Sequence, residues 1–370
     1  MEKLFIGLMS GTSADGINAA LMDFSKATPQ LVETHYYPFS PDLQTAILSF
    51  HKPTMNEIQR MGELDKIIGQ LSARTVLALL KKSRLSAKDI VAIGSHGQTL
   101  RHSPSQGFTL QVGDPNIIAA ETGITTIADF RRRDLALGGQ GAPLVPAFHH
   151  AIFAKKDRPR AIVNIGGIAN ITLLPNDDIR AVTGFDTGPG NTLLDAWTKQ
   201  ETFQPYDKQG TWAATGSIHQ ALLKALLSDP FFALPHPKST GPEYFNMTWL
   251  KRFISPSLLS QDIQCTLTEL TAESIVQSIQ QHLSRGDIFV CGGGVHNDFL
   301  MKRLRILAHP FSVQSTEELG MNPDWIESMA FAWLAKQTLE GKTSNIPAVT
   351  GAKKATVLGG IYPALLTSAS

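Results

Sequence analysis

The sequence predicts an α/β protein built from two similar lobes. Strand-length apolar runs alternate with segments of helical periodicity, as in α/β folds. A strand, a turn of small residues and a second strand occur twice, at residues 4–23 and 161–174, each time at the head of an α/β stretch. With 370 residues and 42% hydrophobic content, the chain is long enough for two sizeable cores.

In the first lobe, the 56–82 segment predicts a helix because its apolar residues recur every three or four positions. Ile90-Val91-Ala92-Ile93 is a short apolar run, typical of a buried strand. The expected order is therefore the hairpin 4–23, a strand over 31–37, helices over 42–50 and 56–82, strands over 90–93 and 108–112, a helix through 121 and a strand ending near 128.

The second α/β unit opens after Arg158-Pro159-Arg160 with the repeated strand–turn–strand segment. Its remaining expected elements are a strand over 180–185, a helix from about 192, a strand over 288–291 followed by a helix, and an amphipathic helix over 325–336.

Composition excludes several classes of protein. A net charge of +1 with 18% charged residues gives no sign of a nucleic-acid binder. Two cysteines exclude a disulfide framework and indicate a reducing compartment. The first apolar run stops at Met9, too early for a signal peptide, and no stretch approaches the ~20 apolar residues of a membrane span. We therefore expect a cytoplasmic protein with no membrane or nucleic-acid partner.

The turn of the first hairpin carries the clearest chemistry. It offers the hydroxyls of Ser10, Thr12 and Ser13, open backbone amides around Gly11, and the carboxylate of Asp15. Successive N–H groups in such a turn form a nest for phosphate, and a nearby carboxylate suits its Mg²⁺. The alternative is an ordinary polar hairpin. The recurrence of glycine-rich turns in the second lobe favours a nucleotide held in a cleft.

Familiar nucleotide and metal motifs do not fit. Gly341-Lys342-Thr343 resembles the end of a P-loop, but it follows a helical pattern and has Lys336 where the first glycine belongs. The glycine-rich stretches 188–193 and 292–297 each lack the last glycine of a dinucleotide fingerprint. The sequence has no HExxH motif and no paired cysteines for zinc.

Six motifs taken together resemble a known family, the anhydro-N-acetylmuramic acid kinases of the hexokinase/Hsp70/actin-like superfamily. They occur in the order MSGTSADG (9–16), GSHGQT (94–99), GGQGAPLVP (138–146), NIGGIAN (164–170), FDTGPGN (185–191) and GGGVHN (292–297). The resemblance spans essentially the whole chain. It implies two ribonuclease-H-like lobes around a central cleft for ATP and substrate, the first over 1–128 and 348–370 and the second over 129–347.

The resemblance also implies a reaction, in which 1,6-anhydro-N-acetylmuramic acid, ATP and water give N-acetylmuramic acid 6-phosphate and ADP in peptidoglycan recycling. The sugar has no free 6-hydroxyl because O6 is bonded to C1, so phosphorylation of O6 must accompany opening of that bond. An inverting glycosidase needs a carboxylate for the water and an acid for the leaving oxygen. Here the γ-phosphoryl group replaces the acid, and one general base suffices.

Asp186 is the candidate base, because it ends a strand just before a glycine-rich turn, where α/β sheets commonly place ligand chemistry. The alternative is a carboxylate that only caps the turn. The family pattern also implies a second acidic residue, Glu327, near the water, whereas a lone helical Glu is more often solvated.

Further site residues follow from the resemblance. Arg131, Arg132 and Arg133 lie near the expected sugar pocket, where one arginine would pair with the lactyl carboxylate of the substrate; a solvated run is the alternative. His96 is as readily a structural histidine as a substrate contact. The implied ATP-binding residues are Gly11, Thr12, Ser13, Ala14, Asp15, Gly16, Ile17, Asn18, Asn164, Gly166, Gly167, Gly292, Gly293 and Asn297, the implied substrate-binding residues are His96, Gln98, Arg131 and Gly141, and Asp15 is the implied Mg²⁺ residue.

Two departures from the family pattern stand out: Asn18 where Asp is usual, and Pro242 where Arg is expected. They affect phosphate or loop contacts rather than the reaction class. Family members also lead us to expect a homodimer. The alternatives are a related sugar or carboxylate kinase, which needs no water-activating base, and an actin-like module that binds ATP without turnover.

Overall fold

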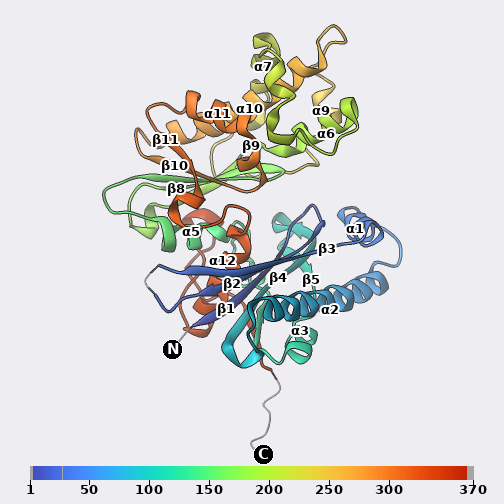
Figure 1. Cartoon of the computed structure of the whole chain (residues 1–370), viewed down its shortest axis with the longest axis vertical. Helices are drawn as coiled ribbons and strands as arrows, with labels where there is room; N and C mark the ends of the chain where they lie inside the picture. Colours follow the sequence, from blue (N-terminus) through green and yellow to red (C-terminus); the bar gives the residue numbers. More distant parts are fainter. Residues whose placement is uncertain (1–2, 27, 365–370) are drawn as a thin grey trace, which may run out of the picture. The chain divides into compact units, whose positions relative to one another are not determined.

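The computed structural model describes residues 3–26 and 28–364. The chain divides into two compact units, each with its own sheet (Figure 1). The first unit holds the residues up to 148 and those from 325 onward, and the second holds 149–324. The segments 129–148 and 325–347, expected in the second lobe, thus belong to the first unit. The main reason is α12 (Ile326–Leu339), which packs on strands β1 and β4 of the first sheet.

The first sheet is a three-stranded antiparallel meander extended by parallel strands. β1–β2 and β2–β3 are antiparallel, whereas β1–β4 and β4–β6 are parallel. The order across this seven-stranded sheet is β12 (Gly360–Tyr362), β6 (Thr126–Ala128), β4 (Ile90–Ser103), β1 (Leu4–Ser10), β2 (Gly16–Asp23) and β3 (Gln30–Pro38), with β5 (Phe108–Val112) paired to β4.

The second sheet repeats this plan with five strands. Its order is β11 (Ser312–Ser315), β10 (Asp287–Cys291), β7 (Arg160–Ile165), β8 (Ile168–Leu174) and β9 (Thr183–Pro189). β7, β8 and β9 form the antiparallel meander, and β10 and β11 continue the sheet in parallel. The repeat confirms the predicted α/β fold with two similar lobes.

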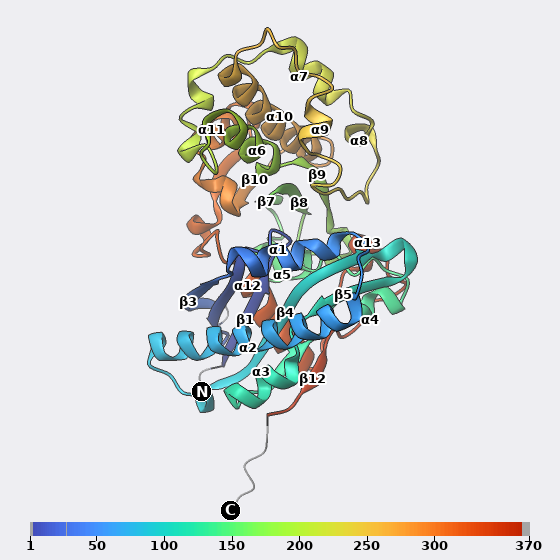
Figure 2. The same cartoon turned by 90° about the vertical axis from the view of Figure 1, so that its right-hand side faces the viewer.

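Helices cover both faces of the first sheet, because successive strand residues point to opposite faces. Leu4, Ile6 and Leu8 of β1 share a core with α2 (Glu57–Ser83). Between them, Gly7 faces α12 so closely that a Cβ would meet the carbonyl oxygen of Ser328. Figures 1 and 2 show α2 beside α3 (Pro115–Thr122). The other helices of this unit are α1 (Pro41–Leu48), α4 (Arg132–Ala136) and α13 (Pro347–Thr350), and the division between the units falls within α5 (Val145–Phe153).

The second unit is organised around α10 (Ser260–Gln280), which is buried along most of its length. Ala272, Ile275 and Ile279 pack in the core of the sheet, and Leu267 and Leu270 pack in a second core formed mostly by helices. The surrounding helices are α6 (Asn191–Thr202), α7 (Gln220–Leu227), α8 (Pro230–Ala233), α9 (Met247–Leu250) and α11 (Asp298–Leu307).

Three local predictions need correction. The strand predicted over 90–93 continues to Ser103, because β5 pairs with its second half. The strand predicted over 180–185 begins only at Thr183, after a short 3₁₀ turn over Ile179–Ala181. It continues to Pro189, so Asp186 lies inside the strand and not at its end, because residues 183–189 pair with β8. The helix predicted as amphipathic, α12, is buried on nearly all sides. In the described part of the chain, no helix has the length and apolar character needed to cross a membrane.

Candidate active site

Asp186 lies in β9, opposite Asn170 of β8, and its side chain is held by a distant loop. Its Oδ2 accepts a hydrogen bond of 2.9 Å from the backbone N–H of Thr240, and its own N–H donates to the carbonyl of Lys238 at 3.1 Å. Oδ1 accepts no hydrogen bond from the described residues. One carboxylate oxygen is thus fixed and the other stays available for a ligand or water.

Burial raises the pKa of Asp186 to about 6. The Thr240 N–H and the positive charge of Lys238 oppose this rise, while the negative charge of Glu243 adds to it. A carboxylate with a pKa near neutrality is well matched to taking a proton from water, since it is mostly ionised at pH 7 yet basic enough to accept one.

The loop over 238–241 is the part of this site that sequence reasoning missed as a contact to Asp186. The Lys238 ammonium donates to the carbonyls of Phe231 and Phe232 and lies 4.7 Å from the centre of the Phe231 ring, which anchors the start of the loop. The Oγ1 of Thr240 is buried with no hydrogen-bond partner among the described residues. The segment Lys238-Ser239-Thr240-Gly241 carries no local sequence signal that connects it to Asp186, which lies more than 50 positions earlier.

Glu327 is in the first turn of α12, and burial raises its pKa, while the positive charge of Arg131 lowers it. Arg131 is partly buried and held on two sides. Its Nε and Nη2 donate to Nε2 of His96 at 3.0 and 2.9 Å, and its Nη1 donates to the Gly141 carbonyl at 2.8 Å. The structure therefore brings four predicted site residues, Glu327, Arg131, His96 and Gly141, into one cluster of the first unit.

The three consecutive arginines have different environments. Arg132 forms an ion pair of 2.7 Å with Asp129, and its side chain is largely exposed, as is Arg133. Of the three, Arg131 is the one that is partly buried. Burial lowers its pKa to about 10, and it is still a cation at neutral pH.

The first hairpin turn is exposed at its tip, and the side chain of Gln98 holds its base through hydrogen bonds. Gly11, Thr12, Ser13 and Asp15 are wholly or partly exposed. The Ser10 hydroxyl lies 2.6 Å from Oε1 of Gln98, whose Nε2 donates to the Gly11 carbonyl at 3.2 Å. Gln98 is fully buried, so in this structure it supports the turn rather than presenting a free amide to a sugar.

The rest of the predicted phosphate-binding segment continues into β2. Ala14 is buried with φ 51°, and its N–H donates to the Gly11 carbonyl at 3.1 Å, which closes the turn. Gly16 is required by close packing, because a Cβ there would meet the carbonyl of Tyr37. Ile17 is buried and Asn18 pairs with Met9 of β1.

In the second unit, three glycine-rich segments pack on one another. The N–H groups of Gly190 and Asn191, at the start of α6, donate to the carbonyls of Gly167 and Gly166 at 2.9 and 2.8 Å. A Cβ on Gly190 would lie 2.4 Å from the Gly166 carbonyl oxygen, so only glycine allows this approach.

The third glycine-rich segment follows β10. Gly292 has φ 78°, and a Cβ there would meet Oδ1 of Asn164, which places these two predicted ATP residues side by side. Gly293 is exposed next to Gly292. Oδ1 of Asn297 caps α11 by accepting from the N–H of Leu300 at 2.9 Å. A structural role thus accounts for the Asn297 side chain.

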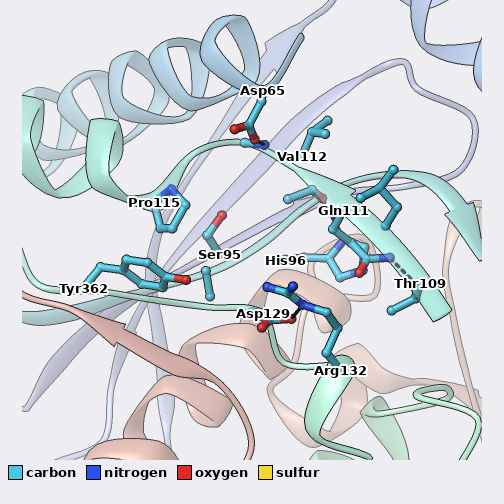
Figure 3. A pocket seen from close by; sticks show the side chains of 14 residues that line it. Asp65, Ser95, His96, Thr109, Gln111, Val112, Pro115, Asp129, Arg132 and Tyr362 are labelled. Atoms are coloured by element: carbon cyan, nitrogen blue, oxygen red, sulfur yellow. Dashed lines mark hydrogen bonds and ion pairs between the residues drawn. The ribbon is translucent and has the colours of Figure 1, made fainter. Parts of the chain in front are cut away.

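A cavity of about 130 Å³ opens in the first unit between β4, β5, the start of α3 and β12 (Figure 3). Asp65, Asp129, Arg132 and Tyr362 line it with polar groups. Ser95 points into the cavity, and its buried Oγ has no hydrogen-bond partner among the described residues.

No group of three or more His, Cys, Asp or Glu side chains suited to holding a metal ion occurs within residues 3–26 and 28–364. The exposed carboxylate of Asp15 stands alone in its turn. This donor set fits Mg²⁺ that is held mainly by phosphate oxygens and water, with one protein carboxylate.

Two copies of one α/β unit, each opening with a strand, a glycine-containing turn and a second strand, form the plan of the two-lobed kinases and ATPases. Residues 3–364 match the family model described as anhydro-N-acetylmuramic acid kinase. The anhydro-N-acetylmuramic acid kinase of Coxiella burnetii is 51% identical over 365 residues, covering 98% of each chain. That of Shewanella denitrificans is 52% identical over 366 residues, covering 98% of this chain and 99% of the relative. The chain belongs to the anhydro-N-acetylmuramic acid kinase family.

Among solved structures, component A of the (R)-2-hydroxyglutaryl-CoA dehydratase of Acidaminococcus fermentans matches with a TM-score of 0.47 and 10% identity, covering 89% of this chain and 96% of that one.

Proposed function

We propose that this chain is an ATP-dependent kinase that opens the 1,6-anhydro ring of 1,6-anhydro-N-acetylmuramic acid and phosphorylates O6. The products are N-acetylmuramic acid 6-phosphate and ADP, as in peptidoglycan recycling. Family membership supports the activity. The single structural observation that carries it is the Asp186 carboxylate, whose Oδ2 is fixed by the Thr240 N–H while Oδ1 stays free. Burial also raises the pKa of this carboxylate to about 6.

The reaction requires a base as well as a phosphoryl donor. Water attacks C1, the C1–O6 bond breaks, O6 forms a bond to the γ-phosphorus, and the bond from that phosphorus to the oxygen retained by ADP breaks. Asp186 takes the proton of the attacking water through its free Oδ1. The N–H of Thr240 keeps the carboxylate in one orientation while this happens.

The other residues bind and orient. The open turn over Gly11–Asp15 and the glycine segments near Asn164 and Gly292 are proposed to hold ATP phosphates and adenosine. The Asp15 carboxylate would help to hold Mg²⁺, which when bound would supply positive charge against the phosphates. The cavity at Ser95 and Tyr362 is proposed to take polar groups of the sugar. Glu327 is proposed as the second acidic group of the reaction. That the protein is a cytoplasmic homodimer stays a prediction.

The test is an ADP-release assay with three sugars: the anhydro sugar, N-acetylmuramic acid and N-acetylglucosamine. Only the first sugar has a 1,6-anhydro ring to open. Turnover of that sugar alone supports the proposal, provided that mass spectrometry identifies the 6-phosphate as the product. In ¹⁸O-water the label belongs on C1 of the initial product and not in the phosphate. Equal turnover with N-acetylmuramic acid, unaffected by Asp186→Asn, would favour a simpler sugar kinase instead.

A further inference from the structure

His96 occupies a position that only a neutral imidazole can fill. Its Nε2 accepts from both Nε and Nη2 of Arg131, and a guanidinium has donors only. Its Nδ1 lies 2.8 Å from the Gly97 carbonyl, which only accepts. Nδ1 therefore carries the proton and Nε2 carries the lone pair. A second proton on Nε2 would point at a cation.

The orientation of the Arg131 guanidinium is set by its hydrogen bonds to His96 and Gly141 and not by an ion pair with a carboxylate. Three of its five N–H groups are used by His96 and Gly141. One N–H on each terminal nitrogen is left over. Glu327 is the residue whose charge acts on Arg131, yet no ion pair within 4.0 Å joins the two among the described side chains. The opposite charges of Arg131 and Glu327 thus lie in one partly buried cluster without forming an ion pair.

We propose that His96 is a positioning residue that restrains the Arg131 guanidinium, keeps it from closing onto the Glu327 carboxylate, and so preserves Glu327 as a group able to exchange a proton. The two remaining Arg131 donors then face an anionic group of the ligand instead of an internal partner. A paired carboxylate next to arginine typically has its pKa lowered by about 1–3 units, which would make Glu327 a poor acid or base near neutral pH.

The surrounding charges support this assignment. Burial and the positive charge of Arg131 lower the pKa of His96 to about 3, and burial lowers that of His102 to about 4, so both are neutral near pH 7. Burial raises the pKa of Glu327 despite Arg131.

No other charged group competes for Glu327 on the strands that α12 packs against. β1 and β6 contain no charged residue. On β2, Asp23 bonds to Ser25 at an exposed end, and on β4, Arg101 pairs with Glu57. Within residues 3–26 and 28–364, Arg131 is the cation whose charge acts on Glu327.

The experiment is a ¹³C NMR titration of Glu327 in the ligand-free full chain, with the Glu327 resonance identified by its loss in Glu327→Gln. Two variants form a matched pair: His96→Leu removes the acceptor, and His96→Gln keeps an acceptor oxygen near the position of Nε2. We expect His96→Leu to lower the pKa of Glu327 by at least about one unit and His96→Gln to leave it close to the wild-type value. An equal pKa in wild type and His96→Leu would overturn the inference.

A measurement on the unaltered protein guards against a variant that does not fold. In ¹⁵N NMR of histidine, Nε2 of His96 should remain unprotonated down to about pH 4; titration near 6.5 would overturn the inference. The consequence for catalysis rests on the proposed function. If Glu327 exchanges a proton in the reaction, the part of the kcat/KM pH profile that reports its pKa should shift in His96→Leu and not in His96→Gln. The NMR pKa values need no activity, so failure of the kinase reaction and failure of this inference are separate results.

Discussion

Replacing Asp186 with Asn should abolish most turnover and at the same time stabilise the protein at alkaline pH. Loss of a general base typically costs ~10²–10⁴ in rate. The pKa of Asp186 rises from 3.8 to about 6 in the fold, so its ionised form is disfavoured there by roughly 3 kcal/mol. Asn carries no charge and can still accept the Thr240 N–H through its amide oxygen.

The sign of the pH dependence follows from that pKa. Because the folded state holds the Asp186 proton more tightly than the unfolded state, the contribution of Asp186 to stability falls as pH rises from about 4 through 6 and no longer changes above about 7. The advantage of the Asn variant should be absent below pH 4 and reach at most roughly 3 kcal/mol at pH 8, which corresponds to a few degrees in melting temperature.

The assays are ADP release at saturating sugar, and scanning calorimetry at pH 4, 6 and 8. Asp157→Asn, an exposed carboxylate of the same unit, is the control and should change neither quantity. Near-normal turnover in Asp186→Asn would mean that the residue is only structural. A melting temperature below wild type at pH 8 would refute the claim that burial opposes its charge.

Three further results are expected. Gln98→Leu should raise the KM for ATP up to about tenfold with a smaller effect on the KM for sugar, because it removes the braces on the first turn; equal changes in both constants would contradict this. Gly190→Ala should destabilise the protein by about 1–3 kcal/mol in denaturant unfolding, since its Cβ meets the Gly166 carbonyl, whereas Gly62→Ala in the open middle of α2 should be neutral or stabilising. Asp15→Asn should raise the Mg²⁺ concentration for half-maximal rate while leaving the protein folded, and an unchanged Mg²⁺ curve would remove Asp15 from the metal site.

Local patterns were sufficient to predict the repeated architecture. The two strand–turn–strand segments and the apolar periodicity of 56–82 are short-range signals, and the structure places β1–β2, β7–β8 and α2 there. The predicted amphipathic character of 325–336 was wrong for a physical reason. Gly7 and Gly94 lack side chains, so α12 comes close enough to the sheet to be buried around most of its surface. A helix pattern does not reveal what the opposing strands allow.

The chemistry of the two acidic residues shows where sequence reasoning stops. Burial raises the pKa of both Asp186 and Glu327, but each is adjusted by residues remote in the chain. Glu243 and Lys238 act on Asp186 from a loop that follows α8, and Arg131 acts on Glu327 from a segment nearly 200 positions away. A motif can place a carboxylate on a strand or at the start of a helix. Its proton affinity, and therefore its use as a base, depends on tertiary neighbours that restrict water and fix the hydrogen bonds.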